Sequence, residues 1–151
     1  MNTDSERQIV LEILTEVLDR QKYFHLVLRQ ALEKYGYLPE YKRAFISRLS
    51  RLTVERKLTL DAALSEVSSV PAGKMKPVIR NILRMAACQI FWFDVPGYAV
   101  VSESVRLARV KGFAGLSGFV NAVSRALLRR KDFLRFFGER GSPLFHAGVP
   151  D

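Results

Sequence analysis

Residues 74–93 read KMKPVIRNILRMAACQIFWF and form the longest apolar-rich run of the chain. Apolar residues recur in this run at the i, i+3, i+4 and i+7 spacing of one face of an α-helix. This apolar face is too broad for a surface helix, so we expect a central helix on which the other helices pack. The polar side of the helix is basic, because Lys76, Arg80 and Arg84 stand about one helical turn apart.

Composition restricts the class of protein. The chain has 151 residues, which suits a single domain, and 48% of them are hydrophobic, which argues against general disorder. No uncharged apolar run reaches the roughly 18 residues that span a bilayer, and the polar N-terminus is unlike a signal peptide. The one cysteine, Cys88, predicts no disulfide and suits a reducing compartment. We therefore expect a cytoplasmic globular protein without a membrane partner.

Helical periodicity also marks the rest of the chain, and no stretch shows the alternation of a β-strand. Six further helices are predicted near residues 5–18, 23–35, 40–57, 59–67, 98–110 and 117–135. Thr59 is the predicted N-cap of the fourth helix in chain order. The sequence thus predicts an all-α fold, a single compact bundle of about seven helices over residues 1–137, with a tail or linker at residues 138–151.

The net charge of +9 favours a polyanionic partner, most often a nucleic acid. Arg125, Arg129 and Arg130 form one basic ridge on the last predicted helix, and a merely solvated face is the alternative. Lys76 and Arg80 are equally open to phosphate contact and to internal pairing. Exposed aromatic residues can stack on unpaired bases, and the candidates for this role are Tyr23, Tyr41 and Tyr98.

Residues that carry catalysis or bind metals are not grouped in this sequence. His25 and His146 are far apart, and neither stands near cysteines or acids at metal-ligand spacing. The glycines of the loop at 111–118 have no preceding strand, so we interpret them as helix-junction residues rather than a phosphate cradle. Cys88 lies in the apolar run, where a small core side chain is the expected role. We expect no catalytic residue, no metal and no cofactor.

Three stretches together resemble the NusB family of RNA-binding helical domains. They are RAFISRL at 43–49 running on to ERKLTLD at 55–61, MKPVIRNILRM at 75–85, and VSESVRLA at 101–108 followed by GFAGLSGFVNAV at 112–123. The resemblance covers roughly residues 5–130, and the order and spacing of the stretches make it specific. It implies a helical bundle that binds RNA.

One branch of the family is more similar than the others. ERKLTLD, KMKPVIRNILRM and GFAGLSGFVN are similar to the N-terminal domain of RsmB-type (Sun-type) methyltransferases, which make 5-methylcytosine in small-subunit ribosomal RNA. In that branch an S-adenosylmethionine-dependent catalytic domain follows, so the chain as given is expected to be a non-catalytic module that positions ribosomal RNA. Free-standing NusB factors begin with an arginine-rich segment, whereas here Arg7 is the only arginine before Arg20.

Two alternatives stay open. The first is a free-standing transcription antitermination factor that binds nascent ribosomal RNA together with a ribosomal-protein partner. The second is a helical module for protein interaction, in which the charge serves solubility alone. The possible partners are therefore ribosomal RNA, a ribosomal protein and a methyltransferase catalytic domain.

The resemblance also suggests roles for single residues. Arg84 is expected to form an internal ion pair with Glu103, an acid at a family position, and Asn121 of the FVN motif is expected to hydrogen-bond at a helix junction. Arg7 aligns with the basic start of the first helix of the family. The full set of candidate RNA-binding residues is Arg7, Lys76, Arg80, Lys111, Arg125, Arg129 and Arg130.

Overall fold

The computed structural model describes residues 5–132 and residue 134, and in this part of the chain it contains seven α-helices and no strand. The elements are α1 (Glu6–Leu14), a π-helical turn η1 (Thr15–Asp19), α2 (Phe24–Lys34), α3 (Glu40–Glu55), α4 (Lys57–Val67), a 3-10 turn η2 (Ala72–Lys74), α5 (Pro77–Trp92), α6 (Gly97–Val110), a 3-10 turn η3 (Ala114–Leu116) and α7 (Ser117–Arg129). The predicted all-α bundle is confirmed. The tail predicted at 138–151 lies outside the described residues.

Helix α5 occupies the centre of the bundle, as the apolar run predicted. It packs against α1, α3, α4, α6 and α7, and every residue from Asn81 to Phe91 is buried. Pro77 starts the helix at a position where its fixed φ fits and its missing N–H is not needed. Lys76 is therefore the N-cap residue rather than a helical one, and the basic stripe of the sequence is shorter than its spacing suggested.

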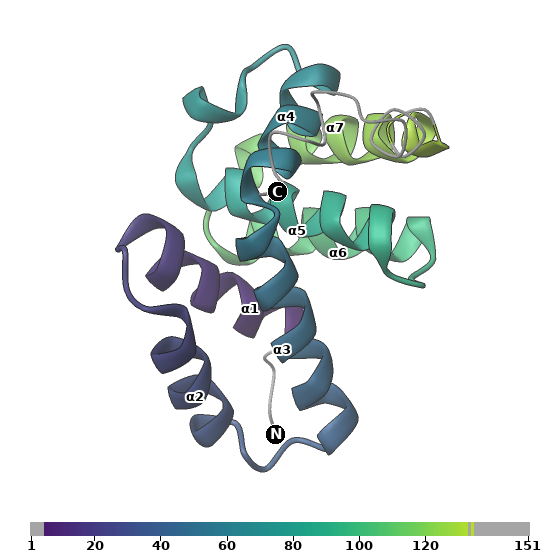
Figure 1. Cartoon of the computed structure of the whole chain (residues 1–151). Coiled ribbons are helices and arrows are strands. Elements are labelled where there is room, and N and C mark those ends of the chain that lie inside the picture. Colours follow the sequence, from purple (N-terminus) through teal and green to yellow (C-terminus); the bar gives the residue numbers. More distant parts are fainter. Residues whose placement is uncertain (1–4, 133, 135–151) are drawn as a thin grey trace.

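The other helices divide into two groups around α5 (Figure 1). Helices α1, α2 and α3 lie together toward one end, and α3 leads almost end to end into α4. Helices α6 and α7 pair on the other side of α5. Gly97 allows this close pairing, because a Cβ at its position would come within 2.5 Å of the Leu128 side chain. The start of α6 therefore meets the end of α7, and the two helices run antiparallel.

Several helix boundaries differ from the prediction, and the largest difference is at the last helix, which ends at Arg129 rather than near residue 135. The first helix ends its α-helical part at Leu14 and continues as a π-helical turn, in which Thr15 Oγ1 donates a hydrogen bond to the Leu11 carbonyl at 2.9 Å. The predicted cap Thr59 is wrong, because only Arg56 separates α3 from α4 and the fourth helix already begins at Lys57. Thr59 is instead buried inside α4. Within the described residues, no helix is long and apolar enough to cross a membrane.

Candidate nucleic-acid interface

A groove between α6 and α7 brings together basic side chains from both helices and one aromatic side chain from α6. It encloses about 490 Å³ and is lined by Tyr98, Val101, Ser102, Val105, Arg106, Arg109, Asn121, Arg125 and Leu128. The α6 residues of this set recur every three or four positions, so they share one face of the helix. That face spans about 16 Å from Tyr98 to Arg109, at 1.5 Å per residue.

The floor of the groove is apolar and its walls are cationic. Val101, Val105 and Leu128 form the apolar part of the lining, while Arg109 and Arg125 are exposed on α6 and α7. Neither arginine has an ion-pair partner among the residues that the structure describes. Such a surface attracts a polyanion that also presents flat apolar groups, which is the chemistry of single-stranded nucleic acid.

Arg106 is held more firmly than the other two arginines of the groove. Its guanidinium pairs with Glu103 at 2.6 Å and donates to the Ser5 hydroxyl at 2.8 Å. Ser5 is the N-cap of α1, where its side chain also accepts a hydrogen bond from the Gln8 backbone N–H. The start of α1 therefore borders the groove, and Arg106 is partly neutralised by a carboxylate, whereas Arg109 and Arg125 are not.

The predicted basic ridge of the last helix divides in the structure. Arg125 lines the groove, and Arg129 is exposed one turn further along α7. Arg130 turns toward α4 instead, where its guanidinium lies 3.8 Å from the Glu66 carboxylate. Lys111, at the end of α6, is partly buried and outside the groove lining. Of the seven candidate RNA-binding residues, one, Arg125, lines the groove.

Among the described residues, the Asn121 side chain does not make the helix-junction hydrogen bond that we expected. Its side-chain oxygen accepts a 3.2 Å hydrogen bond from Nε of Arg125, which stands one turn later on the same helix. The partner is uncharged, so Arg125 keeps its full positive charge. Asn121 thus orients a groove arginine rather than joining two helices.

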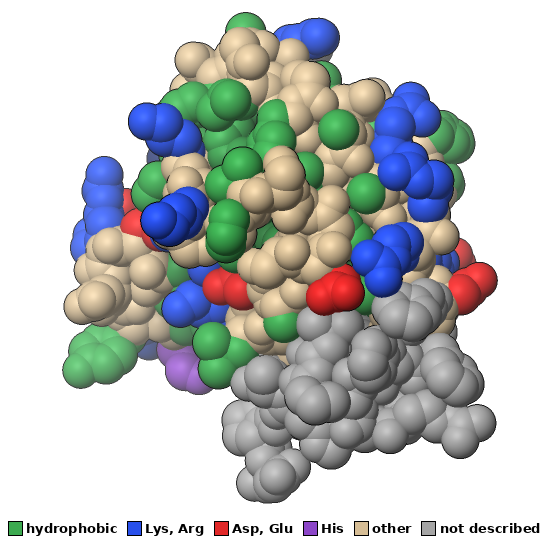
Figure 2. Space-filling model, turned by 90° about the horizontal axis from the view of Figure 1, so that it is seen from above, with side chains coloured by type: hydrophobic (Ala, Val, Ile, Leu, Met, Phe, Trp, Pro, Cys, Tyr) green, Lys and Arg blue, Asp and Glu red, His purple; other side chains and the backbone are tan. Residues whose placement is uncertain are grey.

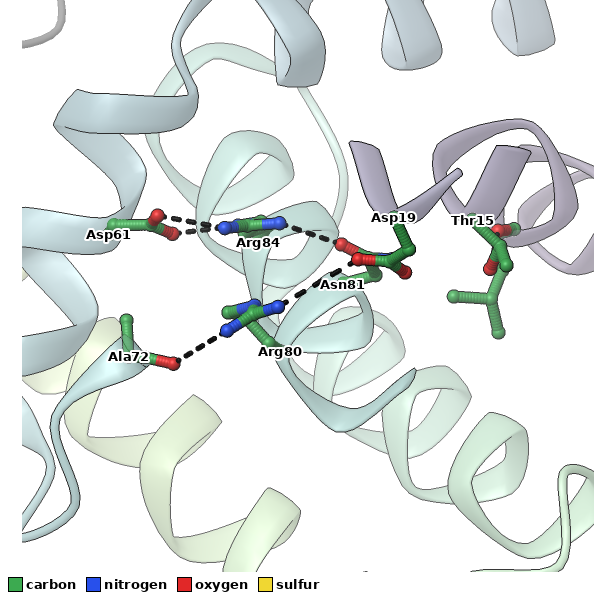
Figure 3. Close-up of polar contacts among 8 residues, drawn as sticks. Thr15, Asp19, Asp61, Ala72, Arg80, Asn81 and Arg84 are labelled. Carbon is green, nitrogen blue, oxygen red and sulfur yellow. Dashed lines mark hydrogen bonds and ion pairs between the residues drawn. The ribbon is translucent and has the colours of Figure 1, made fainter. Parts of the chain in front are cut away.

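The two arginines of α5 face inward (Figure 3). Arg84 is 3% exposed and forms a bidentate pair with Asp61 of α4 at 2.7 and 2.8 Å. It also donates to the Asn81 side chain at 2.8 Å. The expected partner, Glu103, was wrong, because Glu103 lies on the α6 side of the bundle and pairs there with Arg106.

Arg80 belongs to the same polar network. Its guanidinium donates to the Ala72 carbonyl at 3.3 Å and lies 3.7 Å from the Asp19 carboxylate. Asp19 in turn accepts a 2.9 Å hydrogen bond from Asn81. With its side chain 19% exposed and directed at these partners, Arg80 is poorly placed for a phosphate. The network ties η1 and η2 to the central helix.

Arg7 and Lys76 occupy different surroundings. Arg7 donates from Nε to the Gln89 side chain of α5 at 2.7 Å, and its guanidinium lies 5.1 Å from the centre of the Phe45 ring. Burial lowers its pKa from the ordinary value, and the nearby carboxylates of Glu103 and Glu6 oppose this shift. Lys76 is exposed beside a small apolar pocket that includes Met75 and Phe119. Neither residue lines the α6–α7 groove.

Other arginines on and near α3 lie over aromatic rings. The guanidinium of Arg48 lies 4.0 Å from the centre of the Phe93 ring, and that of Arg56 lies 5.9 Å from the Trp92 ring. These cation–π contacts hold the two arginines against rings at the end of α5. Lys and Arg side chains also gather along the edges of the molecular face in Figure 2, with few acids among them. Charge is thus widespread, and in the groove it is combined with the exposed ring of Tyr98.

The sequence did not single out Arg106 and Arg109. Their signal was present, because Tyr98, Ser102, Arg106 and Arg109 repeat at helical spacing on predicted helix 98–110. The spacing could not predict that residues of α7 form the other wall of the groove. Among residues 5–132 and 134, no three His, Cys, Asp or Glu side chains gather closely enough to hold a metal ion.

Comparison with known proteins assigns the fold to a family. The model of the NusB family matches residues 4–129, so the chain belongs to the NusB family. A probable ribosomal RNA small subunit methyltransferase B of Synechocystis is 33% identical over 129 residues, which are 85% of this chain and 29% of that protein. The probable methyltransferase B of Bacillus subtilis is 31% identical over 130 residues, with the same two shares.

A relative of another kind is also similar. The transcription antitermination protein NusB of Syntrophomonas wolfei is 28% identical over 128 residues, which are 83% of this chain and 91% of that protein. The chain therefore spans less than a third of the methyltransferases that it matches and nearly all of the antitermination protein. The predicted resemblance to the NusB-like part of the methyltransferases is confirmed.

Proposed function

We propose that the chain is a non-catalytic RNA-binding module that positions ribosomal RNA for a cytosine-5 methyltransferase. The family membership and the methyltransferase relatives support the class of partner. The observation that carries the proposal is the α6–α7 groove, in which Arg109 and Arg125 are exposed and have no carboxylate partner among the described residues. Placement in the cytoplasm and contact with a methyltransferase catalytic domain are parts of the same proposal.

The experiment is a salt titration of RNA binding by the full chain. A labelled single-stranded fragment of small-subunit ribosomal RNA serves as the probe, and fluorescence anisotropy gives the affinity at each salt concentration. The double variant Arg109→Gln and Arg125→Gln removes two phosphate contacts, so the slope of log affinity against log salt should become shallower by about 1.4. The matched control, Arg29→Gln with Arg51→Gln, removes the same charge from exposed positions on α2 and α3 that have no ion-pair partner among the described residues, and it should change the slope far less.

Two results would contradict the proposal at different levels. Absence of RNA binding by the native chain at low salt would end the RNA-binding proposal itself. Equal slopes for the groove variant and the control would end the assignment to the groove, because the attraction would then come from the net charge of +9 as a whole.

A second candidate function is transcription antitermination with a ribosomal-protein partner. It is favoured by the Syntrophomonas relative, of which the matched region covers 91%. A stable complex with a small-subunit ribosomal protein on a sizing column would support it. Separate elution of the two proteins, together with preferential binding to mature small-subunit ribosomal RNA, would favour the methyltransferase module.

A further inference from the structure

Tyr98 is the feature of the groove that the phosphate contacts do not explain. Its side chain is 76% exposed although it stands in the first turn of α6, and it lines the groove together with Arg109 and Arg125. Exposing so large an aromatic ring leaves apolar surface in water, so a bound ligand that covers the ring would gain free energy. Because Arg109 and Arg125 are positively charged, we expect that ligand to be negatively charged.

The backbone around Tyr98 determines where its side chain leaves the helix. Pro96, at the N-cap of α6, has a restricted φ, and Gly97 lets the start of α6 approach Leu128 of α7. Tyr98 therefore sits at one end of the groove, with Arg109 about 16 Å away along the same helix. Arg125 contributes charge from the opposite wall between these two points.

This arrangement suits an unpaired strand and not a duplex. In an A-form RNA helix the faces of the bases are stacked on one another, so an aromatic side chain has no base face to contact. In a single strand the bases are free to stack on such a ring, while the backbone follows the cations. The apolar floor of Val101 and Val105 adds a dry surface for sugar and base.

We propose that the α6–α7 groove takes a short unpaired segment of RNA, with one base stacked on Tyr98 and phosphates further along the strand on Arg125 and then Arg109. This inference rests on the RNA-binding function proposed above and adds to it the class of substrate and the residue that selects it. Tyr98 contributes affinity through its ring and not through charge. Removal of the ring should therefore weaken the preference for single strands and leave the salt dependence of the RNA affinity unchanged.

The test compares Tyr98→Ala, Tyr98→Phe and the control Tyr37→Ala, whose ring is 64% exposed just after α2. The probes are a fluorescein-labelled single-stranded RNA of mixed sequence, about 12 nucleotides long, and the duplex of the same sequence. Tyr98→Ala should weaken binding of the single strand by roughly fivefold to a hundredfold with an unchanged salt slope. Tyr98→Phe keeps the ring and should bind like the native chain, as should Tyr37→Ala.

The outcomes separate this inference from the function on which it rests. If Tyr98→Ala binds the single strand as tightly as the native chain, while the arginine variant still loses salt dependence, the stacking role is wrong and the RNA-binding function stands. A duplex bound as tightly as the single strand would also overturn the inference. If the native chain binds neither probe at low salt, both proposals fall together.

Discussion

Arginine side chains meet opposite surroundings on two sides of the central helix. On the α4 side, Arg84 is 3% exposed and forms a bidentate pair with Asp61. In the α6–α7 groove, Arg109 and Arg125 are exposed and have no ion-pair partner among the described residues. The difference lies in where the carboxylates stand, and it separates arginines that hold the fold from arginines that are available to a polyanion.

The comparison requires that the interior around α5 be closed to water, and the labelling rate of Cys88 tests this. Of the effects that we predict, this one is expected to be the largest. Burial raises the pKa of its thiol to about 12, and the Thr53 hydrogen bond opposes this in part. Near pH 8 such a thiol is ionised in about one molecule in ten thousand. We expect a disulfide-forming reagent to label the native chain roughly a thousandfold more slowly than the urea-unfolded chain.

The same raised pKa links Cys88 to alkaline stability. The unfolded thiol ionises near its ordinary value of 9.0, while the native thiol stays protonated up to about 12. The stabilisation that the folded state gains by keeping this thiol protonated is therefore fully present below pH 9. It is lost from the free energy of unfolding as the pH rises toward 12. Cys88→Ala should lose less stability over that window than the native chain.

In the labelling experiment, rapid reaction of native Cys88 would mean that α5 is open to water, and the comparison would fail.

Arg84→Met should produce the next largest effect. It leaves Asp61 without its bidentate partner, and breaking a buried pair costs about 3–5 kcal/mol. Because the Asp61 side chain is 24% exposed, water compensates it in part, so we expect about 3 kcal/mol, at the lower end of that range. Denaturant unfolding followed by circular dichroism measures the change.

The matched variant in the groove is Arg109→Met. An exposed arginine without an ion-pair partner among the described residues should change the free energy of unfolding by no more than about 0.5 kcal/mol. Similar losses for Arg84→Met and Arg109→Met would show that burial and pairing do not separate the two classes of arginine.

The fold was largely predictable from the sequence, whereas the partners of single side chains were not. Helical periodicity identified α5 as the central helix because each apolar residue there contributes independently to one face. Which acid meets Arg84 depends on how α4 and α6 are placed around α5, and periodicity carries no such information. The expectation of Glu103 instead of Asp61 therefore failed at the level of packing.

The groove shows the same limit. Arg125 was a candidate because it belongs to a basic ridge on one helix, and the structure keeps Arg125 in the groove but turns Arg130 toward Glu66. Arg109 was missed because its wall of the groove exists only when α6 and α7 are paired. A site built by two helices is visible in the sequence only as two separate half-patterns.

Arg80→Gln should have a smaller effect than Arg84→Met. The Arg80 guanidinium lies 3.7 Å from the Asp19 carboxylate, and Asp19 keeps its hydrogen bond to Asn81 after the change. We expect a loss of about 1 kcal/mol in the free energy of unfolding. RNA affinity should stay unchanged, because Arg80 points into the network rather than toward solvent. A weaker salt dependence in this variant would place Arg80 with the RNA-binding arginines instead.

The smallest expected effect tests the crossing of α6 and α7, on which the groove depends. In the native background, Gly97→Ala puts a Cβ within 2.5 Å of Leu128, and overpacking of this kind costs about 1 kcal/mol or more. A gain in helix propensity of up to about 1 kcal/mol opposes it, so the net loss should be a few tenths to 1 kcal/mol.

The same substitution should change sign when Leu128 is first shortened to Ala. With the opposing methyl groups removed, only the lower entropy of the unfolded chain remains, and Gly97→Ala should then stabilise by about 0.4–1 kcal/mol. A double-mutant cycle measures this coupling between the two positions directly. Equal effects of Gly97→Ala in both backgrounds would mean that the start of α6 does not rest on Leu128, so that Tyr98 would not be held at the end of the groove.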